Sequence, residues 1–164
     1  MMPLLALSLA LGCSGPAERA PVALSPTPAD GHDCGVCGMV VTEQPAPRAQ
    51  VVHRGGERVY LCSIADLRAY LQSPSRRGPP AAVWVEALRD GDPLTRDDTA
   101  PRGWVSPETL TWVVGFERPG VMGRPALGFS DASVAEATRA VLGARSATWQ
   151  QLLETPFDRD PQEE

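Results

Sequence analysis

The strongest constraint on the fold is a hairpin pattern that leads directly into a helix. Two β-branched and aromatic runs, residues 49–53 and 58–62, flank a glycine-rich turn and predict an antiparallel hairpin. Ser63 stands three residues before Asp66, a spacing typical of a helix start. Apolar residues then recur at helical spacing up to Gln72, which predicts a short helix packed against the hairpin.

The same order of elements occurs a second time along the chain. A strand predicted over 82–88 completes the first copy; the second copy has strands over 110–116 and 125–129, a helix over 130–142 and a last strand over 146–149. The pattern predicts an α+β fold of two small strand-strand-helix-strand lobes packed together, behind a flexible N-terminal tether.

The lobes divide the chain into segments. Residues 32–90 are assigned to the first lobe and 104–154 to the second, with a Pro-, Gly- and Asp-rich linker over 91–103 and an acidic tail over 155–164.

The net charge is −5 and aromatic residues make up 5% of the chain. Nucleic acid is therefore excluded as a partner, because phosphate binding requires clustered positive charge.

The N-terminus has the pattern of an export signal. Residues 3–11 are an uncharged apolar run that ends at Gly12-Cys13, and this run is much shorter than the about 20 residues of a membrane-spanning helix. The segment resembles a bacterial lipoprotein signal, with residues 1–12 removed and Cys13 lipidated. The alternative is an apolar strand that ends in a buried cysteine. Residues 13–31 lack periodicity and are predicted to tether the lipid anchor to the folded lobes.

Sulfur dominates the chemistry available to the mature chain. The sequence has four cysteines and four methionines but two histidines. Without the signal and the anchor, the sulfur-bearing residues are Cys34, Cys37, Cys62, Met39 and Met122. Three thiols is an odd number, so at least one of them is free, bound to metal or paired with another chain.

Cys34 and Cys37 are spaced so that both thiols can turn towards one point, as in zinc sites and redox pairs. A zinc site needs four ligands, and Cys62 with either His32 or His53 would supply the remaining two. A thioredoxin-type pair has a strand before it and a helix after it, whereas here a Pro-rich segment precedes the pair and a strand-like run follows it.

The segment Cys37-Gly38-Met39 suggests a third type of metal. If residues 38–41 form a strand, Cys37 and Met39 point to the same face. A thiolate and a thioether together favour Cu(I), although a methionine before two valines is also typical of a core residue. Met122 lies in a glycine-containing turn segment, where a loop methionine can turn towards a ligand.

Cys62 ends a predicted strand just before a helix. The positive end of the helix dipole is expected to lower its thiol pKa, and the residue can be a ligand, half of a disulfide or a small buried side chain. His53 alternates with Val52 and is predicted on a solvated strand face. Five aromatic residues are predicted to serve packing: Tyr60, Trp84, Trp112, Phe129 and Trp149.

These motifs carry a family resemblance. The segment from Cys34 to Val41, the anchor-like Cys13, the run Trp112-Val113-Val114-Gly115 and the pair Met122-Gly123 together resemble the NosL family. Members of that family are copper-binding lipoproteins associated with maturation of nitrous oxide reductase. The resemblance covers roughly residues 32–154.

The resemblance implies a function as well as a fold. It implies a monomeric, non-catalytic Cu(I) carrier in the bacterial cell envelope, anchored by lipid to a membrane and facing the periplasm. Its partners would be a copper transporter complex or a copper enzyme, nitrous oxide reductase in denitrification. Carried over to this sequence, the copper ligands are Cys37, Met39 and Met122, with Cys34 and Cys62 as further candidates.

Two other classes of function remain open. An exported thiol–disulfide or organomercurial-type enzyme would use Cys34, Cys37 and Cys62 and would need a thiol of low pKa. An exported domain without copper would use the same thiols for a Cys34–Cys37 or Cys34–Cys62 disulfide, or for zinc.

Overall fold

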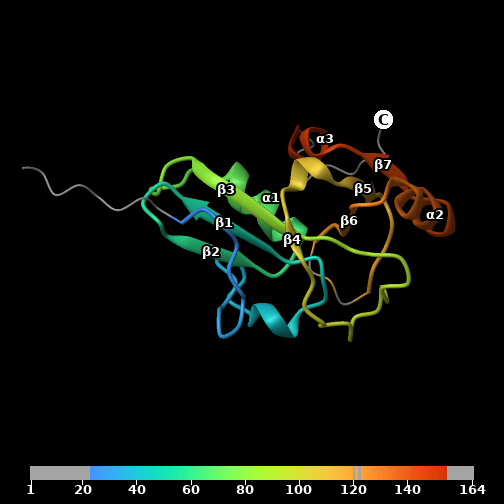
Figure 1. Cartoon of the computed structure of the whole chain (residues 1–164), viewed down its shortest axis with the longest axis horizontal. Helices are drawn as coiled ribbons and strands as arrows, with labels where there is room; N and C mark the ends of the chain where they lie inside the picture. Colours follow the sequence, from blue (N-terminus) through green and yellow to red (C-terminus); the bar gives the residue numbers. More distant parts are fainter. Residues whose placement is uncertain (1–22, 120, 122, 155–164) are drawn as a thin grey trace, which may run out of the picture.

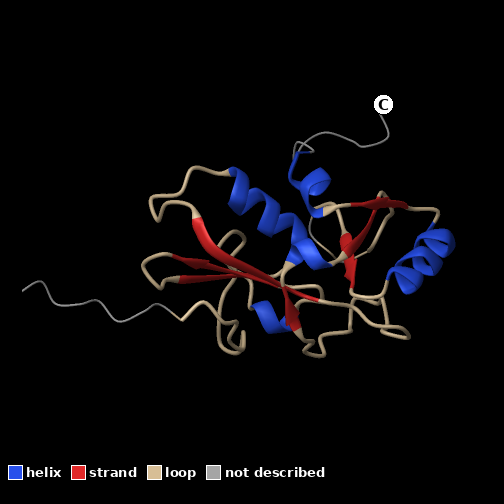
Figure 2. Cartoon of the chain, turned by 45° about the horizontal axis from the view of Figure 1, so that its top comes forward, coloured by secondary structure: helices blue, strands red, loops and turns tan. Residues whose placement is uncertain are grey.

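The computed structural model describes residues 23–119, 121 and 123–154, and within them it confirms the α+β class. In this described part of the chain, seven strands form two antiparallel sheets, and three α-helices pack around them (Figures 1 and 2). None of the described helices is long and apolar enough to cross a membrane. The predicted signal peptide, Cys13, Met122 and the acidic tail lie outside the described residues.

The first sheet contains the predicted hairpin. Its strands are β1 (Ala49–His53), β2 (Arg58–Leu61), β3 (Pro80–Glu86) and β4 (Trp104–Val105), in the order β2-β1-β3-β4. Helix α1 (Ile64–Gln72) follows β2 directly and packs on β1 and β2. As predicted, Ser63 caps this helix, and its Oγ accepts the Asp66 backbone N–H at 3.0 Å.

The second sheet repeats this arrangement with shorter strands. It consists of β5 (Thr111–Val114), β6 (Ala126–Phe129) and β7 (Arg145–Ala147) in the order β6-β5-β7, so the first strand of each unit is central. Helix α2 (Ala132–Leu142) covers this sheet; Asp131 caps its start and Gly143, at φ +63°, ends it. A short helix, α3 (Trp149–Glu154), contacts α1. The repeated order confirms the two-lobe prediction.

A hydrophobic core runs through both lobes. Trp112 of β5 is fully buried in the same cluster as Val51, Leu61 and Leu67 of the first lobe. The next residue, Val113, faces a second cluster under α2. The two lobes are also joined by a backbone hydrogen bond, because the N–H of Leu88, two residues after β3, donates to the Gly128 carbonyl of β6 at 2.8 Å. The lobes are therefore packed as one body.

Residues 23–31, assigned from the sequence to the tether, bond to the first sheet. The side-chain amide of Gln50 donates to the Thr27 carbonyl at 2.8 Å, and its Oε1 accepts the Thr27 N–H at 3.1 Å. The indole of Trp84 donates to the Leu24 carbonyl at 2.8 Å. We call residues 23–31 the N-terminal strap.

The five aromatic residues predicted to serve packing differ in burial. Trp84 is half-buried, whereas Tyr60, Trp112, Phe129 and Trp149 are buried.

Candidate metal centre

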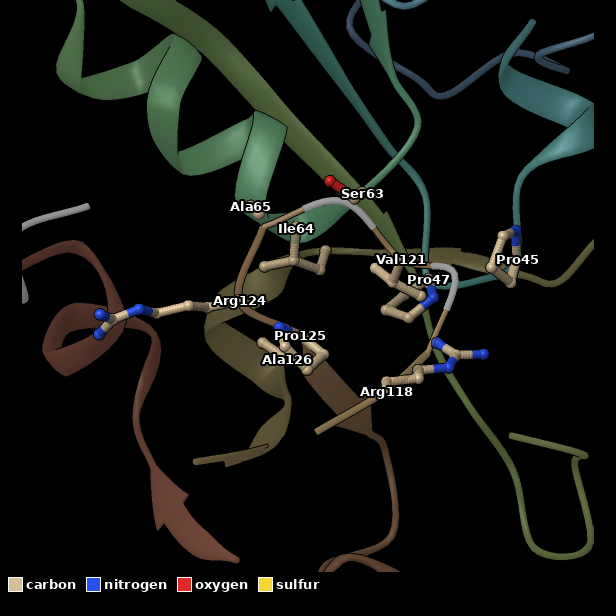
Figure 3. A pocket seen from close by; sticks show the side chains of 10 residues that line it. All are labelled: Pro45, Pro47, Ser63, Ile64, Ala65, Arg118, Val121, Arg124, Pro125 and Ala126. Carbon is tan, nitrogen blue, oxygen red and sulfur yellow. The ribbon is translucent and has the colours of Figure 1, made fainter. Parts of the chain in front are cut away.

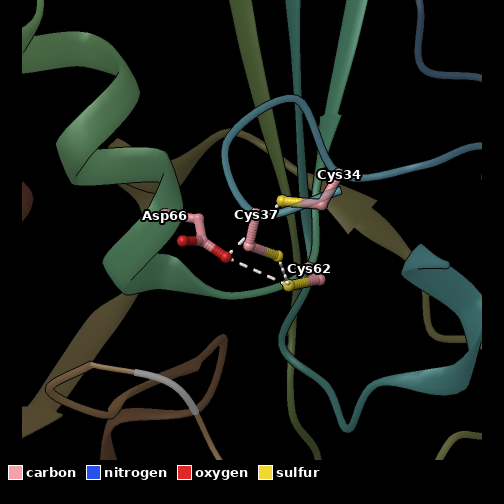
Figure 4. Close-up of side chains that lie close together, drawn as sticks. All are labelled: Cys34, Cys37, Cys62 and Asp66. Atoms are coloured by element: carbon pink, nitrogen blue, oxygen red, sulfur yellow. Dashed lines mark hydrogen bonds between the residues drawn. The ribbon is translucent and has the colours of Figure 1, made fainter. Parts of the chain in front are cut away.

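Three cysteines and one aspartate converge beside the first turn of α1. One ligand atom from each of Cys34, Cys37, Cys62 and Asp66 lies within 4.8 Å of the other three (Figure 4). The Sγ atoms of Cys37 and Cys62 are 3.4 Å apart. All three cysteines are free thiols; Cys34 and Cys62 are buried, and Cys37 is half-buried. The thiol of Cys37 is thus the one that solvent reaches most easily.

The loop that carries Cys34 and Cys37 is attached to strand β2. Cys34 forms an isolated bridge with Tyr60, and the Gly35 N–H donates to the Tyr60 carbonyl at 2.9 Å. A Cβ atom at Gly35 would lie 2.4 Å from a methyl carbon of Val59, so no larger residue fits without movement. This close approach brings Cys34 beside the end of β2, where Cys62 follows.

The expected strand after Cys37 is not present. Gly38 has φ +76°, a backbone conformation that favours glycine, and residues Val41–Glu43 form a 3-10 helix. Cys37 and Met39 therefore do not share one face of an extended strand, contrary to the prediction. Met39 is half-buried against the main core, and its carbonyl accepts the Cys34 N–H at 2.8 Å. The turn at Gly38 closes the loop around the two cysteines.

Asp66 is the member of the cluster that sequence reasoning missed. Its position three residues after Ser63 was interpreted as part of a helix cap, and its backbone N–H does bond to Ser63. The carboxylate itself points to the thiols: Oδ2 accepts from Cys62 Sγ at 3.0 Å and lies 3.5 Å from Cys34 Sγ. The spacing of four residues between Cys62 and Asp66 is the signal available in the sequence.

The thiols differ in acidity. The hydrogen bond from the Cys62 side chain lowers the pKa of Cys34 to about 5, against the opposing effect of burial. The same contact, together with burial and the nearby Asp66 carboxylate, raises the pKa of Cys62, so the expected lowering by the helix dipole is wrong. Burial raises the pKa of Cys37. Cys34 is thus the most acidic of the three thiols, and Cys62 holds its proton more strongly than an ordinary thiol.

Neither histidine joins the cluster. His32 is exposed and stacks on Tyr60, with ring centroids 4.1 Å apart. His53 was expected on a solvated face but is fully buried, and its Nε2 lies 2.8 Å from the Tyr70 hydroxyl. The prediction for His53 failed because α1 covers that face of β1. Asp66 occupies the place in the cluster that was expected for a histidine.

The second lobe approaches the centre through the loop before β6. A shallow pocket at the junction of the lobes is lined by residues from both: Pro45, Pro47, Ser63, Ile64, Ala65, Arg118, Val121, Arg124, Pro125 and Ala126 (Figure 3). Arg118 attaches this loop to the first lobe, because its Nη1 donates to the Ala46 carbonyl at 2.6 Å. Both Val121 and Ser63 therefore line one pocket. In the sequence Val121 precedes Met122, and Ser63 follows Cys62.

Comparisons with known proteins agree with this architecture. The chain is 29% identical over 152 residues to a copper-binding lipoprotein NosL of Stutzerimonas stutzeri, covering 91% of this chain and 78% of that protein. It is also 29% identical over 122 residues to a copper-binding lipoprotein NosL of Achromobacter cycloclastes, covering 73% of this chain and 61% of that protein.

A solved structure shares the fold. The crystal structure of the copper chaperone NosL from Shewanella denitrificans aligns with a TM-score of 0.68 at 23% identity, and covers 80% of this chain and 98% of that chain. The family model for NosL matches residues 25–155, which include both lobes and the whole cysteine–aspartate cluster. The chain belongs to the NosL family.

Proposed function

We propose that this protein is a metallochaperone that binds Cu(I) and delivers it for assembly of a copper enzyme. The observation that carries the proposal is the convergence of three thiols, from the loop at 34–37 and from the end of β2, within 4.8 Å of one another. Soft thiolate ligands select Cu(I). The names of the relatives, copper-binding lipoprotein and copper chaperone, support the same metal.

Cys37 is the proposed entry and exit ligand. It is half-buried, whereas Cys34 and Cys62 are 4% and 3% exposed. A sulfur ligand of a partner can therefore approach copper from the Cys37 side and replace the protein's thiolates one at a time. Copper stays Cu(I) throughout, and each ligand that is still a protonated thiol releases its proton when it binds. No bond of a substrate is broken, so the role is transfer and not catalysis.

Met39 and Met122 are the proposed thioether ligands. Met39 follows Cys37 by two residues in a loop closed by the Cys34–Met39 backbone bond. The case for Met122 rests on the junction pocket, since Val121 and Ser63 line it together. A thioether from the second lobe would let copper binding depend on both lobes.

The setting of the protein is part of the proposal. Lipidation of Cys13 would hold a monomeric chain on a bacterial membrane, with the lobes facing the periplasm. The client would be nitrous oxide reductase, reached directly or through a copper transporter complex during denitrification. The matched relatives named as lipoproteins support the anchor.

Anaerobic titration of the reduced protein with Cu(I), in competition with a chelator, tests the copper site. We expect one tightly bound copper, loss of that binding in Cys37→Ser, and weaker binding in Met122→Ala and Met39→Ala. Cys13→Ser is the matched control, since it removes a thiol assigned to the anchor and should leave the affinity unchanged. Unchanged copper binding in both Cys37→Ser and Met122→Ala would refute the assignment.

One observation favours an enzymatic alternative. The low pKa of Cys34, about 5, is what a thiol–disulfide or organomercurial-type catalyst requires. However, Cys34 is buried, and the more accessible Cys37 has a raised pKa. Turnover of a disulfide or an organomercurial by the metal-free protein, abolished in Cys34→Ser, would establish this alternative.

A further inference from the structure

Four arginines gather at one end of the first sheet. Arg54 lies in the turn between β1 and β2, Arg58 begins β2, and Arg76 and Arg77 lie in the loop between α1 and β3. The two connections are neighbours, because the last residue of β1 pairs with the first residue of β3. Figures 1 and 2 show both connections at the same end of the sheet. We call these four arginines the basic end.

The basic end is positive although the chain as a whole is negative. Glu57 is the single carboxylate in the two connections, whereas the net charge of the chain is −5. Arg54, Arg76 and Arg77 are exposed, and no described carboxylate forms an ion pair with them. Ser75 orders the turn that presents two of them, because its Oγ accepts the Arg77 N–H at 3.1 Å. These guanidinium groups are therefore available to an external anion.

The described part of the chain begins at this same end. The carbonyl of Ala23 accepts a hydrogen bond from Arg58 Nη2 at 2.7 Å. The N-terminal strap then follows β2 towards its other end, where Thr27 Oγ1 lies 2.6 Å from the Tyr60 hydroxyl. In the sequence, ten residues separate Ala23 from Cys13, the proposed site of lipid attachment. A chain of that length reaches at most about 35 Å, so a lipid on Cys13 would keep the basic end close to the bilayer.

We propose that the basic end binds the anionic phospholipid surface of the membrane that holds the chain, and that this contact turns the cysteine centre away from that membrane. The inference rests on the proposed lipid anchor at Cys13 but not on copper. Guanidinium groups form paired hydrogen bonds with phosphate oxygens, and each arginine near an anionic surface strengthens binding about fivefold. A short tether raises the effective concentration of the basic end at the bilayer, so a few weak contacts are enough to orient the chain.

The cysteine centre lies at the opposite end of β2. Arg58 is the first residue of this strand and Cys62 follows its last residue, and four residues of extended chain span about 13 Å. Two exposed carboxylates belong to this end: Asp33 in the cysteine loop and Glu43 in the 3-10 helix that follows it. An anionic surface attracts the basic end and repels these carboxylates, so both effects favour one orientation. In that orientation Cys37, the half-buried thiol, is open to a partner in the periplasm.

Chemical modification of arginines on vesicles tests the inference. The full chain, lipidated at Cys13 and reconstituted on vesicles, is treated with phenylglyoxal, and mass spectrometry gives the modification rate of each arginine. We expect the rates at Arg76 and Arg77 to fall about fivefold when phosphatidylcholine vesicles are replaced by vesicles with about one third phosphatidylglycerol. Arg145, exposed on β7 of the second lobe, is the internal control and should react equally on both. High salt should remove the protection, because it screens surface charge.

Removal of charge should abolish the preferred orientation. In the double variant Arg76→Gln with Arg77→Gln, the protection of Arg54 on anionic vesicles should fall to its value on phosphatidylcholine. The matched control is Arg96→Gln with Arg145→Gln, which removes two exposed arginines elsewhere and should leave the protection of Arg54 unchanged. Both double variants should bind Cu(I) in solution as the native protein does.

Two results would overturn the inference: equal modification of Arg76, Arg77 and Arg145 on anionic vesicles, or undiminished protection of Arg54 in Arg76→Gln with Arg77→Gln. A native chain that does not stay on vesicles would refute the proposed anchor. The same measurement on the unlipidated chain, with excess anionic vesicles at low salt, would then decide whether the basic end binds lipid. Loss of Cu(I) binding with the protection retained would refute the proposed copper function alone.

Discussion

The sulfur atoms of Cys37 and Cys62 lie 3.4 Å apart although the two residues are 25 positions apart in the chain. Each of these two thiols thus contacts a sulfur atom from a distant part of the sequence. The pair at Cys34 and Cys37 is therefore one part of a larger centre and does not act as a separate two-cysteine motif. The third thiol comes from the end of β2, and its carboxylate neighbour comes from α1.

Alkylation should distinguish the three thiols. Cys37 is the half-buried one, while Cys34 and Cys62 are buried, so iodoacetamide should modify Cys37 first in the reduced, metal-free protein. Because burial raises the pKa of Cys37, its rate should still be rising above the ordinary thiol pKa of 9.0. Peptide mass spectrometry gives the order of labelling. Modification of Cys34 or Cys62 before Cys37 would contradict this arrangement of the thiols. When one equivalent of Cu(I) is added first, it should protect Cys37 from alkylation.

Gly35→Ala should destabilise the fold and displace the cysteine loop. The added methyl group would lie 2.4 Å from a Val59 methyl carbon, and overpacking of this kind costs about 1–3 kcal/mol. Urea unfolding measures the loss, and Cu(I) titration shows whether Cys34 has moved. Gly103→Ala is the control, because a Cβ there meets nothing within 4 Å. Equal stability of the two variants would show that the loop is not held against β2.

The acidity of Cys34 predicts a pH dependence of stability. Its pKa is lowered from 9.0 to about 5 by the hydrogen bond from Cys62. Its contribution to the free energy of unfolding is therefore complete above pH 9 and is lost as the pH falls towards 5. The raised pKa of Cys62 has the opposite effect. Its contribution to the free energy of unfolding is present below pH 9 and is lost as the pH rises above 9.

Measurements on the metal-free protein can isolate this effect. The difference in free energy of unfolding between the native protein and Cys34→Ser should increase from pH 5 to pH 9, as followed by urea unfolding with a reductant. Thiolate absorbance in the ultraviolet should titrate with a midpoint near pH 5 in the native protein and lose that step in Cys34→Ser. A first midpoint near 9 would mean that Cys34 has an ordinary thiol.

Local signals explain why much of the fold was predictable. Ser63 and Asp131 cap the two predicted helices through their side chains, and Gly143 ends the second helix in a left-handed conformation. These caps are short-range effects, so the sequence near each helix end specifies them. Strands β1 and β5 each contain two consecutive valines, which is a local signal of the same kind.

The centre was harder to predict because it depends on long-range contacts. The bridge from Cys34 to Tyr60 joins segments whose pairing no local pattern specifies. His53 was misplaced because strand β1 is buried along its whole length, so alternation along that strand does not mark a solvated face. Asp66 was recognised as a helix-start residue, but its contact with thiols depends on where the cysteine loop lies.

The buried ion pair of Arg48 and Glu86 should be essential to the first lobe. Both side chains are 2% exposed, and Arg48 Nε lies 2.7 Å from Glu86 Oε2. Glu86→Gln leaves a buried guanidinium without its counter-charge, which costs about 3–5 kcal/mol. Glu136→Gln on α2 is the matched control, because its ion pair with Arg139 is more exposed and contributes much less to stability. Thermal unfolding that ranks the two variants equally would contradict this role.

The bonds between Gln50 and the N-terminal strap should be detectable in solution. Gln50 is fully buried and pairs with both the N–H and the carbonyl of Thr27. Gln50→Ala removes both bonds, and buried polar groups left unpaired cost about 1–3 kcal/mol. Trp84 should report the release of the strap as a change in fluorescence, because its indole donates to the Leu24 carbonyl.

Limited proteolysis gives the structural readout for the same variant. Cleavage within residues 23–31 should be faster in Gln50→Ala than in the native protein, because a released strap fits a protease site. Gln150→Ala, which removes an exposed amide on α3, should leave the cleavage rate unchanged. Equal cleavage of all three proteins would show that Gln50 does not hold the strap. Faster cleavage in Gln50→Ala alone would show that Gln50 holds the strap on the first sheet. The folded domain would then include the strap, which ends a few residues before Cys34.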